Sequence, residues 1–142
     1  MKKLMLSLIL LVGAVTFASA QDVTGKWKTI DDETGEAKSI VEIYNENGKI
    51  YGKVIEILNP ARKNATCTEC EGADKGKPIE GLVIIKGLEK DGDEYNDGKI
   101  LDPQNGKLYK CYIELEDSNK LKVRGYIGFS LLGRTQYWHR VK

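Results

Sequence analysis

Apolar residues recur at every second position in short runs along most of this chain, and turn-forming residues separate the runs. In the segment 107–116, for example, Tyr109, Cys111, Ile113 and Leu115 fall on one face. A period of two residues is typical of a β-strand with one buried face. Glycine recurs every few residues, and no period of 3.6 residues appears beyond the first twenty residues. The pattern therefore predicts strands and no long helix in the body of the chain.

Eight such runs follow one another, and most of the connections are tight turns such as "NENG" (45–48) and "DPQNG" (102–106). The predicted strands are 24–30, 37–44, 49–58, 81–90, 94–101, 107–116, 121–128 and 134–141. Strands in this order predict an all-β fold, an eight-stranded up-and-down antiparallel barrel. A barrel of eight strands either packs solid or holds one small ligand, and the pattern leaves both outcomes open.

The first twenty residues differ from the rest of the chain. A basic start, "MKK", precedes an apolar run, and "ASA" stands immediately before Gln21. These features predict a signal peptide over 1–20 that is cut after Ala20, although an uncleaved anchor is the alternative. We therefore expect a secreted or periplasmic protein whose mature chain, 21–142, forms a single barrel domain. No stop-transfer segment follows, so no stable membrane insertion of the mature chain is expected.

The charge balance excludes one class of partner. Removing Lys2 and Lys3 leaves 22 − 2 = 20 basic residues against 21 acidic ones. A protein that binds nucleic acid would show a basic excess, and net charge provides no attraction to anionic membranes. No nucleophile elbow, zinc-protease helix or phosphate-binding loop is present, and His139 is the only histidine. We therefore expect a protein that is not an enzyme and that has no cofactor and no metal.

Cys67 and Cys70 lie two residues apart within an unusually long connection, 59–80. A thioredoxin-like pair would open a helix, whereas "EGADKGKP" is a poor helix start. Zinc would need four ligands, and only Cys111 and His139 remain. A local disulfide between Cys67 and Cys70 is the favoured interpretation, with Cys111 left as a buried free thiol on its strand.

The last two strands carry the residues with the most distinctive chemistry. On the seventh, Lys122, Arg124 and Tyr126 share one face, and on the eighth, Arg134, Gln136, Trp138 and Arg140 share one face. Arginine pairs suit a carboxylate or a phosphate, so the candidate ligand-binding residues are Arg124, Tyr126, Arg134 and Gln136. In the alternative, one arginine plugs the barrel and the other pairs with an acid such as Asp31, Asp32 or Asp102.

The turn between these strands, 128–133, is "GFSLLG", with Phe129, Leu131 and Leu132 where polar residues are usual. The turn either folds back as a cap over the barrel end or exposes an apolar patch to a partner. Capping is the favoured expectation.

A resemblance adds to this interpretation. The motif "GKW" at Gly25–Trp27 and the late strand bearing Trp138 and Arg140 resemble the calycins, which include lipocalins and avidins. More closely, "GKWKTIDDETGEAKS", "DGKILDPQNGKLY" and "LKVRGYIGFSLLGRTQYW" resemble a secreted bacterial family, domain-of-unknown-function family 2147. The resemblance implies the barrel and secretion. It also implies structural roles for Gly25, Trp27, Trp138 and Arg140, with the indole of Trp27 under a late arginine at the closed end.

Direction along the strands favours Arg140 for that contact, because the end of the last strand lies near the start of the first. Two functions remain open on these grounds. The first is a secreted or periplasmic barrel that binds a small or amphiphilic ligand. The second is an envelope interaction module that uses the 59–80 loop and the 128–133 turn. A thiol redox protein is a third, more distant interpretation.

Overall fold

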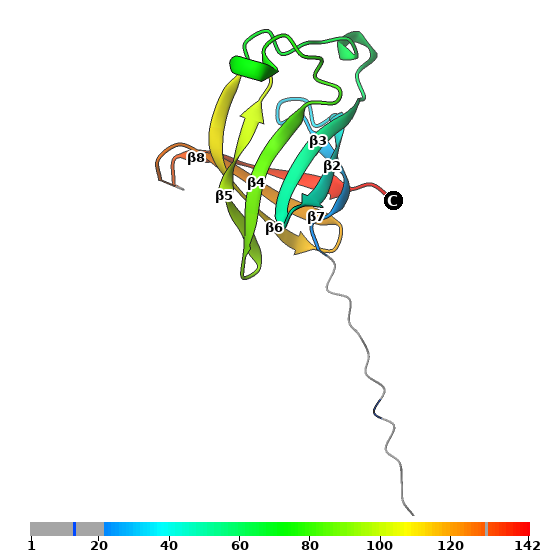
Figure 1. Ribbon diagram of the computed structural model, residues 1–142. Helices are drawn as coiled ribbons and strands as arrows, with labels where there is room; N and C mark the ends of the chain where they lie inside the picture. The colour runs from blue at the N-terminus through cyan, green and yellow to red at the C-terminus, as the bar shows by residue number, and fades with distance from the viewer. Residues whose placement is uncertain (1–12, 14–21, 130) are drawn as a thin grey trace, which may run out of the picture.

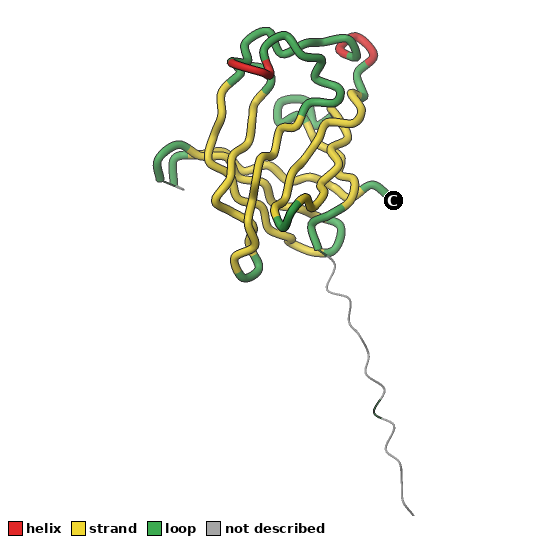
Figure 2. The backbone as a smooth tube through the Cα atoms, in the orientation of Figure 1, coloured by secondary structure: helices red, strands yellow, loops and turns green. Residues whose placement is uncertain are grey.

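The structure is a computed structural model that describes Gly13, residues 22–129 and residues 131–142. The predicted signal peptide lies outside the described residues, apart from Gly13. Figures 1 and 2 show a barrel of strands with a long connection arching over one end. The strands are β1 (Gly25–Ile30), β2 (Ala37–Glu46), β3 (Lys49–Ile57), β4 (Val83–Asp91), β5 (Glu94–Asp102), β6 (Lys107–Asp117), β7 (Lys120–Tyr126) and β8 (Gly133–Arg140).

Two short 3-10 helices, η1 (Pro60–Arg62) and η2 (Gly72–Asp74), lie in the long connection between β3 and β4. Within the described residues no helix is long and apolar enough to cross a membrane. The predicted strands match the observed ones within a few residues at each end.

Each strand pairs antiparallel with the next, and β1 pairs with β8, so the barrel is closed. This confirms the predicted all-β, eight-stranded up-and-down architecture. The seam between β1 and β8 is short: Trp27 lies opposite Arg140, and Lys28 lies opposite His139. Closure satisfies the backbone groups that an open sheet would expose at its edges.

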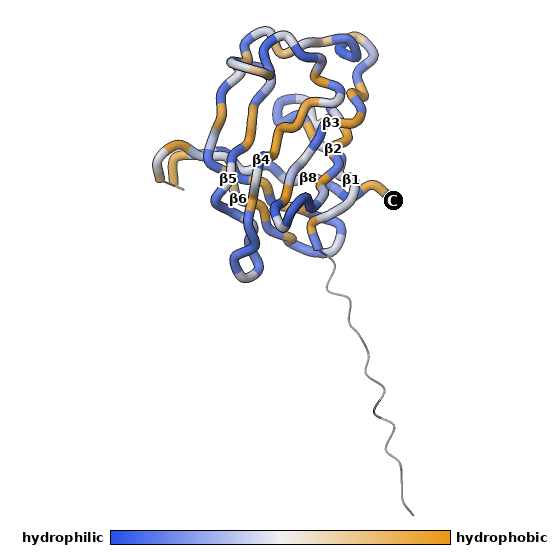
Figure 3. Tube along the Cα trace, in the orientation of Figure 1, coloured by the Kyte–Doolittle hydropathy of each residue, from blue (hydrophilic) through white to orange (hydrophobic). Residues whose placement is uncertain are grey.

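The alternation of residue types decides which face of each strand points inward. On β7, Leu121 and Val123 are buried, whereas Lys122 and Arg124 are only half-buried. The hydropathy pattern along the strands in Figure 3 shows the same mixture of apolar and polar positions. Burial of one apolar face per strand is the main favourable term in forming such a barrel.

One end of the barrel is closed around Trp27, which is completely buried. Its Nε1 donates a hydrogen bond to the carbonyl oxygen of Val23 at 2.9 Å, which satisfies the polar atom of the indole. The guanidinium carbon of Arg140 lies 4.3 Å from the centre of the indole ring. The late arginine over Trp27 is therefore Arg140, and Arg134 lies near the opposite end.

Arg140 also ties three backbone segments together. Its side chain donates to the carbonyl oxygens of Ser118 at 2.7 Å, Thr24 at 2.8 Å and Asp22 at 2.9 Å. The guanidinium presents several donors in a rigid plane, so one side chain can stack on the indole and bond all three. Gly25 makes this possible: its φ is 125°, and an added Cβ would lie 2.8 Å from Nη1 of Arg140.

The half of the barrel next to Trp27 is packed with apolar side chains. The fully buried residues with the largest side chains there include Ile43, Leu88, Ile113 and Leu121. Cys111 belongs to this core as a free thiol, as predicted, and burial raises its pKa to about 12. The thiol is therefore protonated at neutral pH and unreactive.

The long connection is held against the barrel by its own bridge. Cys67 and Cys70 form the predicted disulfide, with their Cα atoms 5.3 Å apart, and both residues are buried. The adjoining backbone pairs Thr66 with Pro78. No α-helix follows Cys70, as a thioredoxin-like site would require. The disulfide also removes the two thiolates that a zinc site would use.

The disulfide faces the turn between β5 and β6. The Sγ atom of Cys67 lies 3.6 Å from the carbonyl oxygen of Pro103. Gly106, with a φ of 72°, approaches the backbone of Glu69 so closely that an added Cβ would collide with it. The bridge therefore anchors the connection to the β5–β6 turn at the barrel rim.

Replacing Trp27 by Ala should lower the free energy of unfolding by about 3–5 kcal/mol, since a large aromatic side chain leaves a fully packed site. Urea denaturation would measure this loss. Tyr137→Ala is the matched control, because that aromatic side chain lies 42% exposed on the outer face of β8. Equal losses for the two variants would contradict the role given to Trp27.

The double variant Cys67→Ser/Cys70→Ser should lose about 2 kcal/mol of stability, because the closed loop is very short. Hydrogen exchange should accelerate in 59–80 and remain unchanged in β1 and β8. If exchange accelerated equally in β1 and β8, the bridge would stabilise the whole barrel, contrary to the local role assigned here.

Candidate functional site

The end of the barrel opposite Trp27 is hollow. A cavity of ≈ 640 Å³ opens there, between the β1–β2, β5–β6 and β7–β8 turns and the long connection. Its wall includes apolar residues from several strands, among them Val54 and Ile57 of β3, Ile100 of β5 and Val123 of β7. The volume lies within the usual range for small-molecule sites. The barrel is thus filled at its closed end and empty at its open end.

Three residues of β8 with polar groups line this cavity at successive levels between its rim and its floor. Arg134 lies opposite Gly125 at the rim, Gln136 lies opposite Val123, and Trp138 lies opposite Leu121 next to the packed core. All three β8 residues line the cavity. Nε1 of Trp138 is 3.4 Å from Oε1 of Gln136, a long hydrogen bond. The buried indole of Trp138 therefore forms part of the cavity floor.

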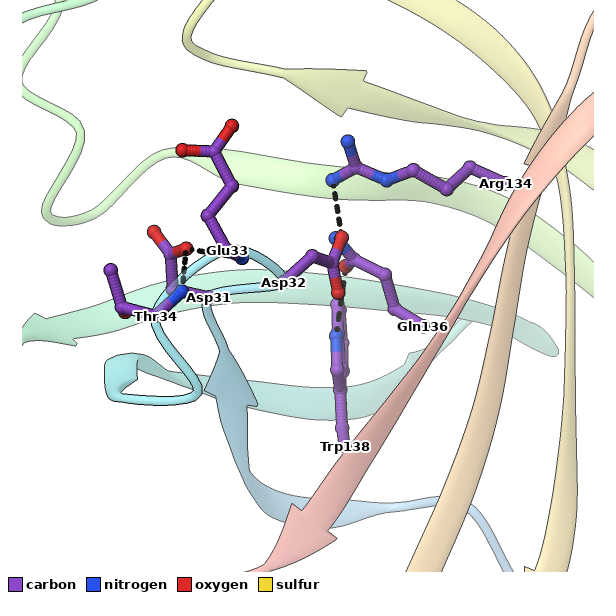
Figure 4. Close-up of polar contacts among 7 residues, drawn as sticks. All are labelled: Asp31, Asp32, Glu33, Thr34, Arg134, Gln136 and Trp138. Carbon is purple, nitrogen blue, oxygen red and sulfur yellow. Dashed lines mark hydrogen bonds and ion pairs between the residues drawn. The ribbon is translucent and has the colours of Figure 1, made fainter.

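An acidic side chain from the β1–β2 turn completes the cluster, as Figure 4 shows. Oδ2 of Asp32 accepts a hydrogen bond from Nε2 of Gln136 at 3.0 Å and pairs with Nη2 of Arg134 at 2.9 Å. Asp32 and Arg134 remain well exposed, with 42% and 68% of their side-chain areas accessible. Such an exposed ion pair contributes little to stability, so its groups are available for exchange with a polar ligand.

The turn that holds Asp32 has a defined shape. Oδ1 of Asp31 accepts hydrogen bonds from the backbone nitrogens of Glu33 at 2.8 Å and Thr34 at 3.1 Å, which Figure 4 also shows. These bonds lower the pKa of Asp31, and the bond from the Glu33 backbone has the larger effect, followed by the bond from Thr34. Asp31 thus orders the turn and leaves Asp32 to face β8.

Two more polar groups lie in the wall. Thr29 and Ser39 join their hydroxyl groups at 2.7 Å across the β1–β2 pair, and both line the cavity. At the rim, Nδ2 of Asn105 donates to the hydroxyl of Tyr109 at 3.0 Å. The cavity therefore combines apolar walls with a few hydroxyl and amide groups, an arrangement suited to orienting a bound molecule.

The four residues proposed from the sequence as ligand-binding fall into two groups. Arg134 and Gln136 line the cavity, and Tyr126 lies at its rim. Arg124 lies on the outer face of β7, where its Nη1 donates to Oγ1 of Thr135 at 2.7 Å. The two arginines that flank the turn therefore point to opposite sides of the sheet, because Arg124 pairs with Thr135 and Arg134 pairs with Gly125.

The β7–β8 turn does not cap the barrel, and the favoured expectation for it is corrected. Phe129 is 76% exposed and Leu131 is 89% exposed. In Figures 1 and 3 the turn projects sideways from the barrel, away from the long connection. The backbone bonds of the turn, from Ile127 to Leu132 and from Leu132 to Phe129, hold a compact hairpin end. Ile127 and Leu132 line the cavity, but the exposed tip does not cover the opening.

The sequence reasoning missed the part of the cavity wall that comes from the long connection. Arg62, Ala65 and Ile79 line the cavity beside the strands. The connection has no period from which an inward face can be assigned. Within 59–80, Ile79 is the only large aliphatic residue, and it was the only signal available.

Among the described residues, no group of three or more histidine, cysteine or acidic side chains is placed to hold a metal ion. The chemistry available at the open end is hydrogen bonding, ion pairing and apolar contact. This arrangement suits reversible binding of a molecule with apolar and polar parts.

Comparison with known proteins agrees with this fold. The chain is similar to the solved structure of HP1028 from the human pathogen Helicobacter pylori, which is described as a member of the lipocalin family. The TM-score is 0.75 at 21% sequence identity, and the match covers 85% of this chain and 84% of that chain. The barrel is accordingly lipocalin-like. No curated protein matches the chain significantly.

A family model described as "Uncharacterized protein conserved in bacteria (DUF2147)" matches residues 25–140. The match starts at Gly25, the first residue of β1, and ends at Arg140, the last residue of β8, so it spans the whole barrel. The protein belongs to this bacterial family, DUF2147, and has a lipocalin-like barrel.

Proposed function

We propose that this protein binds a small amphiphilic ligand inside its barrel and that it does so without catalysis. The observation that carries the proposal is the cavity of ≈ 640 Å³, which opens at one end and is sealed at the other by Trp27 and Arg140. A lipocalin-like barrel supports small-ligand binding at the level of the fold, and the geometry of the open end supports the class of ligand.

The distribution of polar groups favours an amphiphile over a wholly apolar or wholly polar molecule. The apolar part would lie against Val54, Ile100 and Val123 in the wall. The polar end would lie at Arg134 and Gln136, which are already paired with the exposed Asp32. A ligand carboxylate or phosphate could replace Asp32 on the guanidinium without leaving a buried charge unpaired.

We further propose that the protein works in the periplasm or outside the cell. Disulfides form and persist in oxidising compartments, and the Cys67–Cys70 bridge fits such a setting. The predicted signal peptide supports the same location. Cleavage after Ala20 would be read directly from the N-terminal residue of protein isolated from its own source.

The alternative function is an interaction module of the envelope that uses the 59–80 loop and the 128–133 turn. The exposed Phe129, Leu131 and Leu132 favour a contact role for the turn. The loop fits this role less well, because it contributes Ala65 and Ile79 to the cavity wall and buries its disulfide.

Blocking the cavity should abolish ligand uptake. Ala65 lines the cavity, whereas Ala61 is exposed on the same connection and does not line it. In a titration with 11-dansylaminoundecanoic acid, a fluorescent fatty-acid analogue, Ala65→Trp should weaken binding at least tenfold, and Ala61→Trp should bind as the wild type does. If the two variants bound equally, the cavity would not be the site. If neither variant nor the wild type bound this probe, the amphiphile proposal would be wrong for a fatty-acid chain.

The arginines that flank the β7–β8 turn provide a second, charge-specific test. Arg134→Gln should weaken binding of the same probe about fivefold to twentyfold, because a charge-assisted bond to a carboxylate contributes roughly 1.5–3 kcal/mol before solvent screening at an exposed site. Arg124→Gln removes the same charge from the outer face and should bind normally. A larger loss for Arg124→Gln would place the polar end of the ligand outside the barrel.

A further inference from the structure

Large apolar residues are exposed together at the tip of the β7–β8 hairpin. Ile127 is 64% exposed, Phe129 76%, Leu131 89% and Leu132 66%. Four large apolar side chains at one turn are costly to leave in water, because turns are normally polar. Of these four, the binding site accounts for only Ile127 and Leu132, which belong to its rim.

A group of cations lies on the outer face of the sheet next to this tip. Lys99 and Lys110 lie opposite each other on β5 and β6, and Lys110 lies opposite Tyr126 at the end of β7. Arg124 lies on the same face, with Tyr112 and Thr135 as its cross-strand neighbours. No acidic residue lies directly opposite Lys99 or Lys110 in the register of these strands. The near-neutral net charge of the chain therefore conceals a local basic surface.

An acidic cluster occupies a different side of the rim. Asp31, Asp32, Glu33 and Glu36 lie on the β1–β2 turn, and Asp32 pairs with Arg134. Asp102 lies opposite Lys107. The cations Lys99, Lys110 and Arg124 therefore lie next to the hairpin tip, whereas further along the same strands Glu114 lies opposite Glu94 and Lys122. The acidic turn lies beyond β8. A flat, negatively charged surface would contact these cations only in one orientation. In that orientation the hairpin tip points at the surface and the outer face of β6 is turned toward it.

We propose that the β7–β8 hairpin inserts its apolar tip into a lipid bilayer while Lys99, Lys110 and Arg124 contact anionic headgroups. An apolar insertion combined with a basic patch is the pair of signals that gives a peripheral protein useful membrane affinity. A protein partner fits less well, because a stable protein interface buries about 800 Å² on each side. A narrow projecting tip with four apolar side chains presents a much smaller contact area.

The position of the tip connects this surface to the cavity. Ile127 and Leu132 are exposed at the tip and also line the opening. Both residues therefore adjoin the cavity, whose apolar wall includes Ile100 and Val123 and whose rim also carries Arg134. The docking surface goes beyond the proposed ligand binding and does not require it, since the tip and the basic face are outside the barrel.

Vesicle flotation tests the proposal. The mature protein should float with vesicles of phosphatidylglycerol and phosphatidylcholine in equal parts, and should float less with phosphatidylcholine alone. Phe129→Ser/Leu131→Ser should reduce the bound fraction at least tenfold, whereas Val141→Ser, at the closed end, should leave it unchanged. Lys99→Gln/Lys110→Gln should reduce binding to the anionic vesicles only and make it less sensitive to salt.

Three results would overturn the proposal. The first is that the wild type floats with neither kind of vesicle. The second is that Phe129→Ser/Leu131→Ser floats as well as the wild type does. The third is that the wild type binds no vesicles but is a dimer in sedimentation velocity, and that the same double variant is a monomer. The last result would make the tip an interface between copies of the chain. Titration with 11-dansylaminoundecanoic acid in the absence of vesicles separates this test from the pocket, because Phe129→Ser/Leu131→Ser should bind that probe normally.

Discussion

The contact between Trp27 and Arg140 is the constraint on which the barrel depends. Only two residue pairs join β1 to β8, the strands at the two ends of the sheet, so the closing seam has few backbone hydrogen bonds of its own. Arg140 strengthens it by stacking on the indole and by bonding backbone oxygens before β1 and in the β6–β7 turn. A sheet of these eight strands without that link would have two open edges. The glycine at position 25 is needed because the guanidinium occupies the space where a side chain would stand.

Closure at one end determines what the other end can do. The indoles of Trp27 and Trp138 and the aliphatic side chains around them fill the barrel up to the level of Leu121. Above that level several inward positions carry small or polar residues beside apolar ones such as Ile57 and Ile100. Thr29, Ser39, Gly125 and Gln136 line this upper part. Small and polar residues cannot fill the width of an eight-stranded barrel, so a cavity remains. The hollow is therefore a consequence of side-chain size along the strands, and no lid or separate domain is required to form it.

The strand order and the closed end were predictable from the sequence, because both depend on local patterns. Alternation identified the strands, turn residues separated them, and direction along the chain chose Arg140 over Arg134 as the partner of Trp27. The face of Arg124 was harder to assign. The arginine chemistry predicts that the polar side of β7 is the ligand side, although the apolar residues Leu121 and Val123 indicate that the opposite side points inward. The pairing of Arg124 with Thr135 then places it away from Arg134.

Features that depend on how the turns and loops pack could not be derived from the sequence pattern. The outward direction of the 127–132 hairpin follows from its own backbone bonds, and neither hydropathy nor spacing encodes it. Similarly, the near-zero net charge argues against nucleic acid, but a sum over the chain cannot show that Lys99, Lys110 and Arg124 gather on one face. In an antiparallel barrel, adjacent strands bring together residues that lie more than ten positions apart in the sequence, so surface charge becomes interpretable only once the register is known. Here the register places Lys99, Lys110 and Arg124 beside the apolar hairpin, and these two surfaces together have the character of an amphiphile.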